Sequence, residues 1–274
     1  TFCIVPSVRG PEISRRPSDI INEAKQLVES GIKEITLLGQ NVNSYGRDLK
    51  IDNKSSPYFA KLLTQLNEID GLSRIRFTSP HPNDLKEETI YAVREVDKVC
   101  TQIHVPLQSG SSKLLSRMHR GYNKERFIQK IDMIKSIVPD VSLTTDIIVG
   151  FPGEDKNEFD ITLEFIKNLD MSYLHVFPYS ERANTRAISL NESVPIEERN
   201  KRSKVLRLLS DKKKRYFYES NLNNVRNVLF ENKVNGDFIY GFTDNYVKTK
   251  IKFNKKLVGK ECNILLKKVD DDLS

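Results

Sequence analysis

The first 180 residues alternate between two hydrophobic periods, and this alternation constrains the fold more than any other feature of the chain. Apolar residues on one helical face predict helices at 17–30, 59–70, 83–96, 124–138 and 155–169. Short apolar runs between them predict strands at 33–39, 74–79, 101–108, 141–150 and 172–180. Strands separated by helices at this spacing are typical of βαβ units, so the pattern predicts an α/β domain with a parallel sheet.

Two architectures satisfy this pattern. A sheet curled into a partial (βα) barrel, similar to part of a TIM barrel, is the first choice, and a doubly wound open sheet is the second. No strand fits before Pro17, so the repeat begins on a loop. Such a start is unusual for an intact α/β domain.

The last third of the chain changes character. Residues 195–219 form one long basic segment with the pattern of a helix. Residues 226–269 instead carry short strand-like segments, and Asn235-Gly236 is a hairpin-turn signal. We expect a small all-β module, an OB-like barrel. The domain boundary is placed near 220–225, which gives one domain at 1–220 and another at 225–274.

Composition narrows the class of protein. A hydrophobic content of 38% with 30% charged residues is typical of a soluble globular protein, and no apolar run approaches the roughly 18 residues that span a membrane. Cys3, Cys100 and Cys262 are too few and too far apart for a disulfide framework, which favours a reducing cytoplasm. The net charge of +7 permits a nucleic-acid partner without requiring one.

Polar loops follow all five predicted strands. They are Gly39–Asn43, Ser79–Pro82, Gln108–Ser111, Gly150–Glu154 and Phe177–Ser180. The carboxyl ends of parallel strands meet at one end of the sheet, so these loops are expected to hold a polar small molecule together. Turn geometry alone also favours Gly, Ser and Asn in such loops, which makes each loop ambiguous by itself. Five polar loops in register favour a binding site.

Histidines and cysteines give no metal motif by spacing alone. His81 and His104 lack any HxH, HExxH or CxxC context. We expect His104 to be a packed histidine on a strand and His81 to be a rigid loop residue between prolines. Cys100 and Cys262 lie in apolar contexts and are expected to be inert.

Basic residues concentrate near the carboxyl end. Residues 201–219 hold eight Lys or Arg against two acids, and lysines alternate along 248–252, which places them on one face of a strand. A solvated amphipathic face is the ordinary interpretation of such charges. Together, the helix and strand are expected to form a basic surface that contacts RNA phosphates. The candidate RNA-binding residues are Lys201, Arg202, Lys212, Lys213, Lys214, Arg215, Lys248, Lys250 and Lys252.

Seven segments carry a specific family resemblance. In chain order they are TFCIVPSVRG, LLGQNVNSYG, IRFTSPHP, HVPLQSGS, RMHRGY, TTDIIVGFPGE and VFPYSERANT. They resemble the MiaB-type radical S-adenosylmethionine (SAM) methylthiotransferases over nearly the whole chain. The β-module is similar to the family's C-terminal RNA-binding TRAM domain. The resemblance implies a partial-barrel radical SAM domain followed by TRAM.

The resemblance also implies iron–sulfur clusters. The family holds its radical SAM [4Fe-4S] cluster on a C-x-x-x-C-x-x-C loop, and Cys3 matches the last of these cysteines. The other two cysteines, the strand before them and an N-terminal domain with an auxiliary cluster are missing from this chain. Three thiolates leave one iron open for SAM. The resemblance therefore implies a parent enzyme with two clusters, of which this chain is an inactive fragment.

The strand-end loops gain roles in SAM binding from the same resemblance, although no catalytic residue is assigned. The implied contacts are Asp146, Gly150 and Glu154 beside the adenosine; Gln40, Asn41, Gln108, Ser109 and Arg120 near the ribose and methionyl parts; and the backbone around Phe177 and Tyr179 near the adenine.

The implied reaction inserts a methylthio group at C2 of a hypermodified adenosine beside the tRNA anticodon. SAM is cleaved reductively, and the 5′-deoxyadenosyl radical abstracts the hydrogen at C2, with the protein supplying placement and exclusion of water. The expected partners are the tRNA anticodon stem-loop and an electron donor. We expect a cytoplasmic monomer without a membrane partner.

Two substrate branches match different segments. LLGQNVNSYG and RFTSPHP resemble the branch acting on N6-isopentenyladenosine, whereas HVFPYSERANT and GFTDNYVK resemble the branch acting on N6-threonylcarbamoyladenosine. The catalytic domain carries the first signature, which favours N6-isopentenyladenosine, with the second substrate as the alternative. Two further classes stay open: a non-catalytic RNA-binding protein on this scaffold, and a SAM-binding protein that uses polar chemistry without a cluster.

Overall fold

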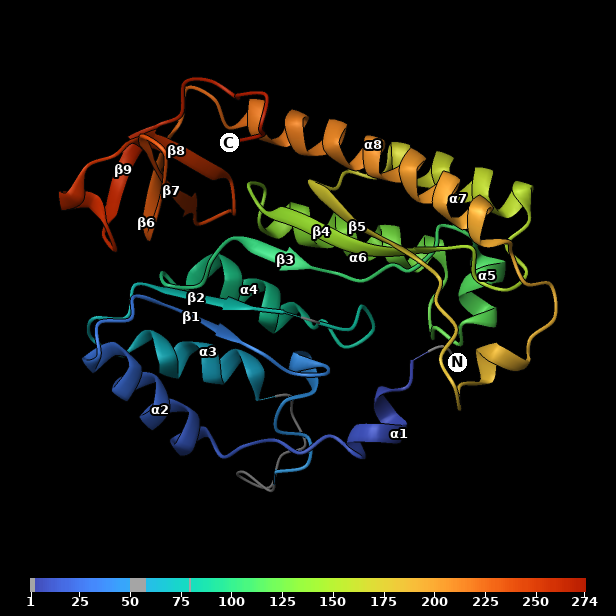
Figure 1. The fold of residues 1–274 in the computed structure, drawn as a ribbon. Coiled ribbons are helices and arrows are strands. Elements are labelled where there is room, and N and C mark those ends of the chain that lie inside the picture. Colours follow the sequence, from blue (N-terminus) through green and yellow to red (C-terminus); the bar gives the residue numbers. More distant parts are fainter. Residues whose placement is uncertain (1–2, 50–57, 79) are drawn as a thin grey trace.

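Five parallel strands build the first part of the molecule (Figure 1). The computed structural model describes residues 3–49, 58–78 and 80–274. The strands are β1 (Glu34–Leu37), β2 (Arg74–Phe77), β3 (Gln102–His104), β4 (Ser142–Val149) and β5 (Tyr173–Pro178). β1 pairs with β2, β3 and β5 flank β4, and every pairing is parallel. The predicted α/β fold with a partial barrel is confirmed.

The sheet is divided between β2 and β3. Within the described residues, a single parallel bridge between Ile75 and Val99 joins the two groups of strands. It is made by two hydrogen bonds, from Ile75 N to Lys98 O and from Cys100 N to Ile75 O. No further pairing joins the two groups among the residues that the structure describes.

Helices cover the strands in the expected places. They are α2 (Pro17–Glu29), α3 (Phe59–Asn67), α4 (Glu87–Glu95), α6 (Lys124–Ile137) and α7 (Lys156–Asn168). Their apolar faces meet alternate strand residues such as Ile103, Leu143 and Ile147, which are fully buried. Asp155 caps the start of α7 by accepting a hydrogen bond from Glu158 N, which is the usual role of Asp at a helix start.

Two short helices were not predicted, and all five parallel strands are shorter than predicted, β3 most of all. α1 (Val5–Arg9) and α5 (Ser112–Arg117) lie in segments that were expected to be loops. β3 ends at His104 and not at residue 108, because Pro106 has no backbone N–H to donate and Gln108 adopts a φ of 76°. Gln108 rejoins β4 through one isolated bridge to Ile147.

The long basic helix α8 (Ile196–Ser220) packs along β5 (Figure 1). Its Ser210 hydroxyl accepts from Leu174 N at 3.0 Å and donates to Leu174 O at 2.9 Å. Arg207 donates to Val176 O at 3.4 Å. These side chains satisfy backbone groups of an edge strand that would otherwise be open to pairing with another chain.

A second, antiparallel sheet follows α8. Its strands are β6 (Val225–Asn235), β7 (Phe238–Thr243), β8 (Lys248–Lys252) and β9 (Glu261–Leu265), in the order β8-β7-β6-β9. The predicted hairpin is confirmed, since Gly236 has a φ of 57° between paired Asn235 and Phe238. The small all-β module is therefore confirmed, and 1–220 and 225–274 stay our predicted domain boundaries.

The β-module lies at the amino ends of the parallel strands (Figure 1). Arg74, the first residue of β2, donates to Phe242 O of β7 at 2.7 Å. Thr101, which immediately precedes β3, donates to Asp244 Oδ2 at 3.2 Å. The strand-end loops lie at the opposite end of the barrel, so the strands separate these loops from the β-module.

Candidate functional site

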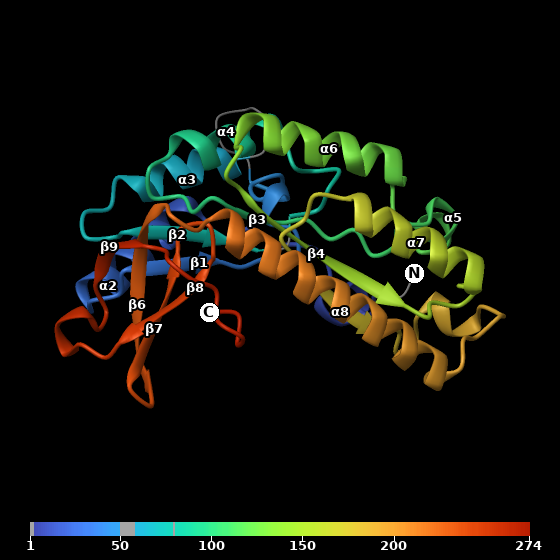
Figure 2. The same cartoon turned by 90° about the horizontal axis from the view of Figure 1, so that it is seen from above.

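The strand-end loops gather at one end of the barrel because all five strands run in the same direction. Figures 1 and 2 place the N-terminal segment, which includes α1, at this end as well. Residues 12–15 are held against the loop after β1 through four hydrogen bonds. They run from Ser44 Oγ to Glu12 Oε2, from Gly46 N to Ser14 Oγ, from Tyr45 Oη to Arg15 O and from Ser14 N to Asp48 Oδ2.

Cysteine placement does not suit a cluster held by this chain alone. Cys3 is exposed in the N-terminal segment, whereas Cys262 lies on β9 of the β-module. Cys100 is buried, and burial raises the pKa of its thiol to about 12. Among the described residues, no group of three His, Cys, Asp or Glu side chains is placed to hold a metal ion. A SAM-binding [4Fe-4S] cluster needs three thiolates, and the described residues do not bring three together.

The loop after β1 contains two predicted SAM contacts with different surroundings. Gln40 is exposed. Asn41 donates to Asp84 Oδ2 at 2.6 Å and accepts from His81 N at 3.2 Å. Asn41 thus ties the loop after β1 to the loop after β2, and its amide is occupied by the protein itself. Ser79 of the latter loop lies outside the described residues, as do Thr1 and Phe2.

The loop after β3 is also largely internal. Ser109 is fully buried, and its hydroxyl lies 3.2 Å from Thr162 Oγ1 and accepts from Ser111 N at 3.1 Å. This hydroxyl fixes the loop against α7, so we remove Ser109 from the proposed SAM contacts. Gln108 stays in that set, because its backbone bonds to Asp146 O and places it beside β4.

A polar cluster lines the inner face of β3, β4 and β5. His104 Nε2 lies 3.2 Å from Asp146 Oδ2, and His104 Nδ1 lies 2.9 Å from Thr144 Oγ1. The His175 ring lies 5.4 Å from the His104 ring. Burial, and next the neighbouring His104, lowers the pKa of His175. His104 is therefore part of a polar inner wall with Asp146, which the interpretation as a packed histidine missed.

The loop after β4 is braced from within by a buried ion pair. Glu154 Oε1 accepts from Gly150 N at 2.7 Å and from Arg202 Nη1 at 2.8 Å. Glu154 is 2% exposed and Arg202 is 6% exposed. Gly150 has a φ of 74°, and a methyl group there would collide with the Arg199 side chain. These contacts assign Gly150, Glu154 and Arg202 to the scaffold, which corrects the expectation that Arg202 faces RNA.

The end of β5 combines an exposed ring with a buried one. Phe177 is 51% exposed and pairs in register with half-buried Ile148. Tyr179 is buried against Phe151, with ring centroids 5.4 Å apart, and its carbonyl accepts from Arg199. Phe177 is two residues beyond His175, the register partner of Asp146, and therefore lies on the same face of the sheet as Asp146. An exposed ring and a carboxylate on one face suit an adenine ring and ribose hydroxyls, so these residues fit the adenosine part of SAM.

Arg120 lies just after α5, half-buried, beside the loop that follows β2. Its charge, after burial, contributes to the lowered pKa of His81. Arg120 therefore lies close enough to the strand-end loops to stay a proposed contact for the carboxylate of SAM.

The β-module presents aromatic rings together with its lysines. Lys248 lies over the Tyr240 ring at 4.7 Å, and Lys250 lies over the Phe238 ring at 5.5 Å. Lys250 also donates to Asp272, and its hydrogen bonds to the carboxylates of Asp270 and Asp272 raise its pKa. The rings at alternate positions of residues 237–242 were a readable signal that the sequence interpretation missed. Interleaved rings and cations are typical of single-stranded nucleic-acid surfaces.

The basic face of α8 is smaller than predicted. Lys201 and Lys212 are exposed. Lys213 Nζ donates to Leu169 O at 2.7 Å, and Lys214 lies over the Tyr173 and Tyr218 rings. Arg215 pairs with Glu219 of the same helix at 3.8 Å. The most open RNA candidates are therefore Lys201, Lys212 and Lys252.

The family model described as the Radical SAM superfamily matches residues 1–166. Curated relatives carry the name tRNA-2-methylthio-N(6)-dimethylallyladenosine synthase. The relative from Clostridium tetani is 52% identical over 206 residues, covering 75% of this chain and 45% of the relative. The relative from Carboxydothermus hydrogenoformans is 41% identical over 262 residues, covering 95% and 59%. The chain thus spans 40 to 59% of the length of these curated relatives.

Solved structures agree on the fold. Coproporphyrinogen III oxidase (HemN) from Escherichia coli matches with a TM-score of 0.54 at 11% identity, over 83% of this chain and 60% of that chain. SuiB from Streptococcus suis matches with a TM-score of 0.50 at 14% identity, over 73% of this chain and 41% of that chain.

None of the described helices is long and apolar enough to span a membrane. The predicted resemblance to MiaB-type methylthiotransferases is confirmed, and members of the matched superfamily use SAM and a [4Fe-4S] cluster. The chain belongs to the radical SAM superfamily.

Proposed function

We propose that this chain is the barrel and RNA-binding portion of a tRNA methylthiotransferase. The enzyme would insert a methylthio group at C2 of N6-isopentenyladenosine, also called dimethylallyladenosine, next to the anticodon. The observation that carries this proposal is the set of family-type loops at one end of the barrel, where Gln40 and Phe177 are exposed. The names of the relatives favour this substrate over N6-threonylcarbamoyladenosine.

In this proposal, SAM binds at the carboxyl ends of the strands and, when bound, supplies the radical chemistry. Phe177 stacks against the adenine, and Asp146 accepts hydrogen bonds from ribose hydroxyls. His104 keeps the Asp146 carboxylate oriented through its 3.2 Å contact. Cys3 is one thiolate ligand of the cluster, and we propose that the other two come from residues outside these 274.

RNA would approach through the β-module and α8. Lys201, Lys212 and Lys252 contact phosphates, and Phe238 and Tyr240 offer rings on which unpaired bases stack. The anticodon loop suits such a surface because its bases are already unpaired. We propose that the protein acts in the cytoplasm, as a monomer, with a separate electron donor that reduces the cluster.

Nucleoside mass spectrometry of tRNA tests the proposal. Cells lacking the complete gene are expected to lose 2-methylthio-N6-isopentenyladenosine and to accumulate N6-isopentenyladenosine. The wild-type gene and a surface control, Asp160→Asn on α7, should restore the modification, whereas Asp146→Asn should restore less than about a tenth. Loss of the methylthio derivative of N6-threonylcarbamoyladenosine would assign the alternative substrate. Unchanged levels of both nucleosides would contradict the enzymatic role.

A further inference from the structure

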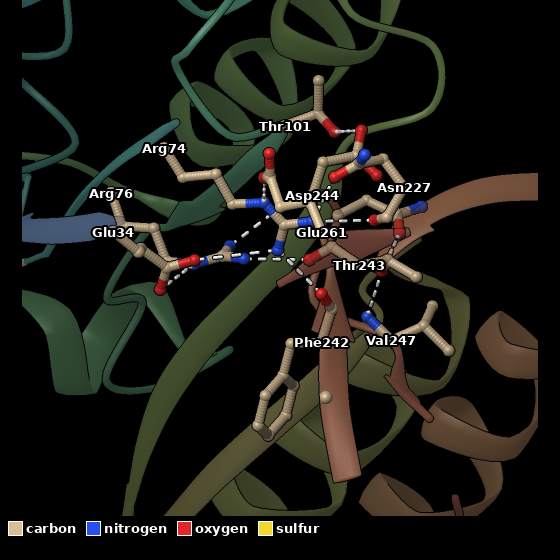
Figure 3. Close-up of polar contacts among 12 residues, drawn as sticks. Glu34, Arg74, Arg76, Thr101, Asn227, Phe242, Thr243, Asp244, Val247 and Glu261 are labelled. Carbon is tan, nitrogen blue, oxygen red and sulfur yellow. Dashed lines mark hydrogen bonds and ion pairs between the residues drawn. The ribbon is translucent and has the colours of Figure 1, made fainter. Parts of the chain in front are cut away.

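Two buried arginines of β2 reach out of the barrel into the β-module (Figure 3). Arg74 is 4% exposed. It donates from Nη1 to Phe242 O at 2.7 Å, from Nη2 to Asn227 O at 2.8 Å, and from Nε to Glu261 Oε1 at 3.0 Å. A second bond from Nη2 reaches Asn227 Oδ1 at 2.7 Å. Three nitrogens of one guanidinium therefore bind three different strands of the module.

Arg76 repeats this arrangement two residues later, on the same face of the strand. It is 5% exposed and donates to Asp244 O at 3.0 Å and to Thr243 O at 2.8 Å. Its Nε donates to Glu34 Oε1 of β1 at 3.0 Å, and its guanidinium lies 4.7 Å from the Tyr246 ring centroid. Arg76 thus connects β1 with the turn between β7 and β8.

These contacts fix the orientation of the β-module relative to the barrel. Most of the acceptors are backbone carbonyls, whose positions are set by the β-module sheet itself. Glu34 and Glu261 supply the negative charge that two buried cations require. A planar guanidinium offers donors in a fixed fork, so it orients its partners in a way that a lysine ammonium does not.

α8 provides a second, independent connection. It is braced at its start by Arg202 on Glu154, and near its end Tyr218 Oη accepts from Lys248 N at 3.0 Å. A 25-residue helix is about 37 Å long, so α8 spans the distance between the strand-end loops and the β-module. The end of α8 packs against the module, where Tyr218 forms one apolar cluster with Val247 and Leu266. A module held only at the end of α8 can still tilt about the connection at 221–224, and the arginines hold it at a second place.

We propose that Arg74 and Arg76 are positioning residues for the RNA substrate. They hold the β-module at one orientation to the barrel, so that RNA bound on its basic and aromatic face delivers the target base to the strand-end loops. This proposal rests on the proposed function for its RNA substrate, although the orientation itself is a property of the chain.

The orientation is tested by electron paramagnetic resonance distance measurements. Spin labels are placed at Glu88→Cys on α4 and Lys252→Cys on β8, with Cys3 and Cys262 replaced by serine in these samples. We expect one narrow distance distribution for the parent and for Arg94→Lys, a matched change at an exposed arginine of α4. The double variant Arg74→Lys/Arg76→Lys should give a broadened distribution, because it keeps both charges but loses the fork. A distribution as narrow as that of the parent would overturn the proposal.

Catalysis is tested with the protein expressed from its complete coding sequence and an anticodon stem-loop RNA. For Arg74→Lys/Arg76→Lys, we expect kcat/KM for RNA modification to fall at least about tenfold, since small misplacements of a substrate cost large factors in rate. The Kd for the RNA should change less than about threefold, and SAM cleavage without RNA should be unchanged. An unchanged kcat/KM, or an equal loss of RNA-independent SAM cleavage, would refute a positioning role.

Failure of the proposed function can be distinguished from failure of the positioning proposal. If the wild-type enzyme modifies no RNA, the proposed function fails, while the distance measurement still tests the orientation. If the double variant does not fold, as judged by circular dichroism, Arg76→Lys and Thr101→Val take its place in the same two assays. Thr101→Val removes only the 3.2 Å bond to Asp244, so a smaller broadening in the same direction is expected.

Discussion

Arg202 Nη1 lies 2.8 Å from Glu154 Oε1 in the interior, although the two residues come from segments with different predicted roles. Arg202 belongs to the basic helix α8, and Glu154 belongs to the loop after β4. The pair fastens the helix that supports β5 to a loop at the candidate SAM site. It therefore links the stability of the barrel with the shape of that site.

Breaking the ion pair between Arg202 and Glu154 should lower the free energy of unfolding. Glu154→Ala leaves the buried guanidinium of Arg202 with the backbone carbonyl of residue 154 and with the partly exposed Glu198 as its remaining anionic partner, so the free energy of unfolding should fall by about 3–5 kcal/mol. Urea unfolding followed by circular dichroism measures the change. Asp160→Ala breaks the exposed Lys156–Asp160 pair and should cost about 0.5 kcal/mol or less. Equal losses for the two variants would argue against a buried brace.

The Ser210 hydroxyl of α8 satisfies backbone groups at the edge of β5. Ser210→Ala removes both hydrogen bonds to Leu174 and leaves buried backbone groups unsatisfied, so a loss of about 1–3 kcal/mol is expected. Ser220→Ala, which removes an exposed hydroxyl of the same helix, is the control and should change the free energy of unfolding by less than about 0.5 kcal/mol. If Ser210→Ala matches this control, α8 does not protect the strand edge through Ser210.

Stability should depend on pH through His175, which faces His104, Asp146 and Tyr173. Its pKa is lowered by burial, so near pH 6 the unfolded chain binds a proton that the folded chain does not. The free energy of unfolding therefore falls as pH drops through about 6.5, the ordinary histidine value, and levels off below the folded pKa. His175→Gln should lose less stability than the wild type between pH 7.5 and 5.5. Chemical denaturation at both pH values checks this, and parallel losses would contradict it.

RNA affinity should depend on the lysine face of the β-module and on salt. Lys248→Ala/Lys252→Ala should weaken RNA binding and reduce the slope of log K against log salt by about 0.7 for each phosphate that the variant no longer neutralises. Fluorescence anisotropy with an anticodon stem-loop at several salt concentrations measures both quantities. Lys156→Ala on α7 removes an exposed lysine away from this face and should leave the slope unchanged. The same slope for both variants would place the RNA elsewhere.

Local patterns were sufficient to predict the order of elements, the parallel strands and the β-module. Hydrophobic period depends on neighbours a few residues apart, and so does the turn at Gly236. The early end of β3 could also have been predicted from the sequence, because Pro106 has no backbone N–H to donate to a neighbouring strand. The left-handed φ of Gln108 was not readable, because only its tertiary contacts with Asp146 and Ile148 require it.

Site residues were harder to predict because burial is decided by distant segments. Ser109 and Glu154 lie in loops of the right kind, but α7 and α8 cover them and use their polar atoms. Arg202 and Lys201 are neighbouring basic residues that lie on different faces of α8. The sequence contains no local signal for which of these faces meets the barrel. The arginines of β2 look like ordinary strand residues until the β-module is placed beside them.

Formation of 5′-deoxyadenosine from SAM tests the central claim most directly. The protein from the complete coding sequence, reconstituted with iron and sulfide and reduced with dithionite, is mixed with SAM and assayed by liquid chromatography. We expect 5′-deoxyadenosine from the wild type, less than about a hundredth as much from Cys3→Ser, and unchanged amounts from Cys262→Ser. Undiminished product from Cys3→Ser would contradict the assignment of Cys3 to the cluster and, with it, the account of this end of the barrel as a radical SAM site.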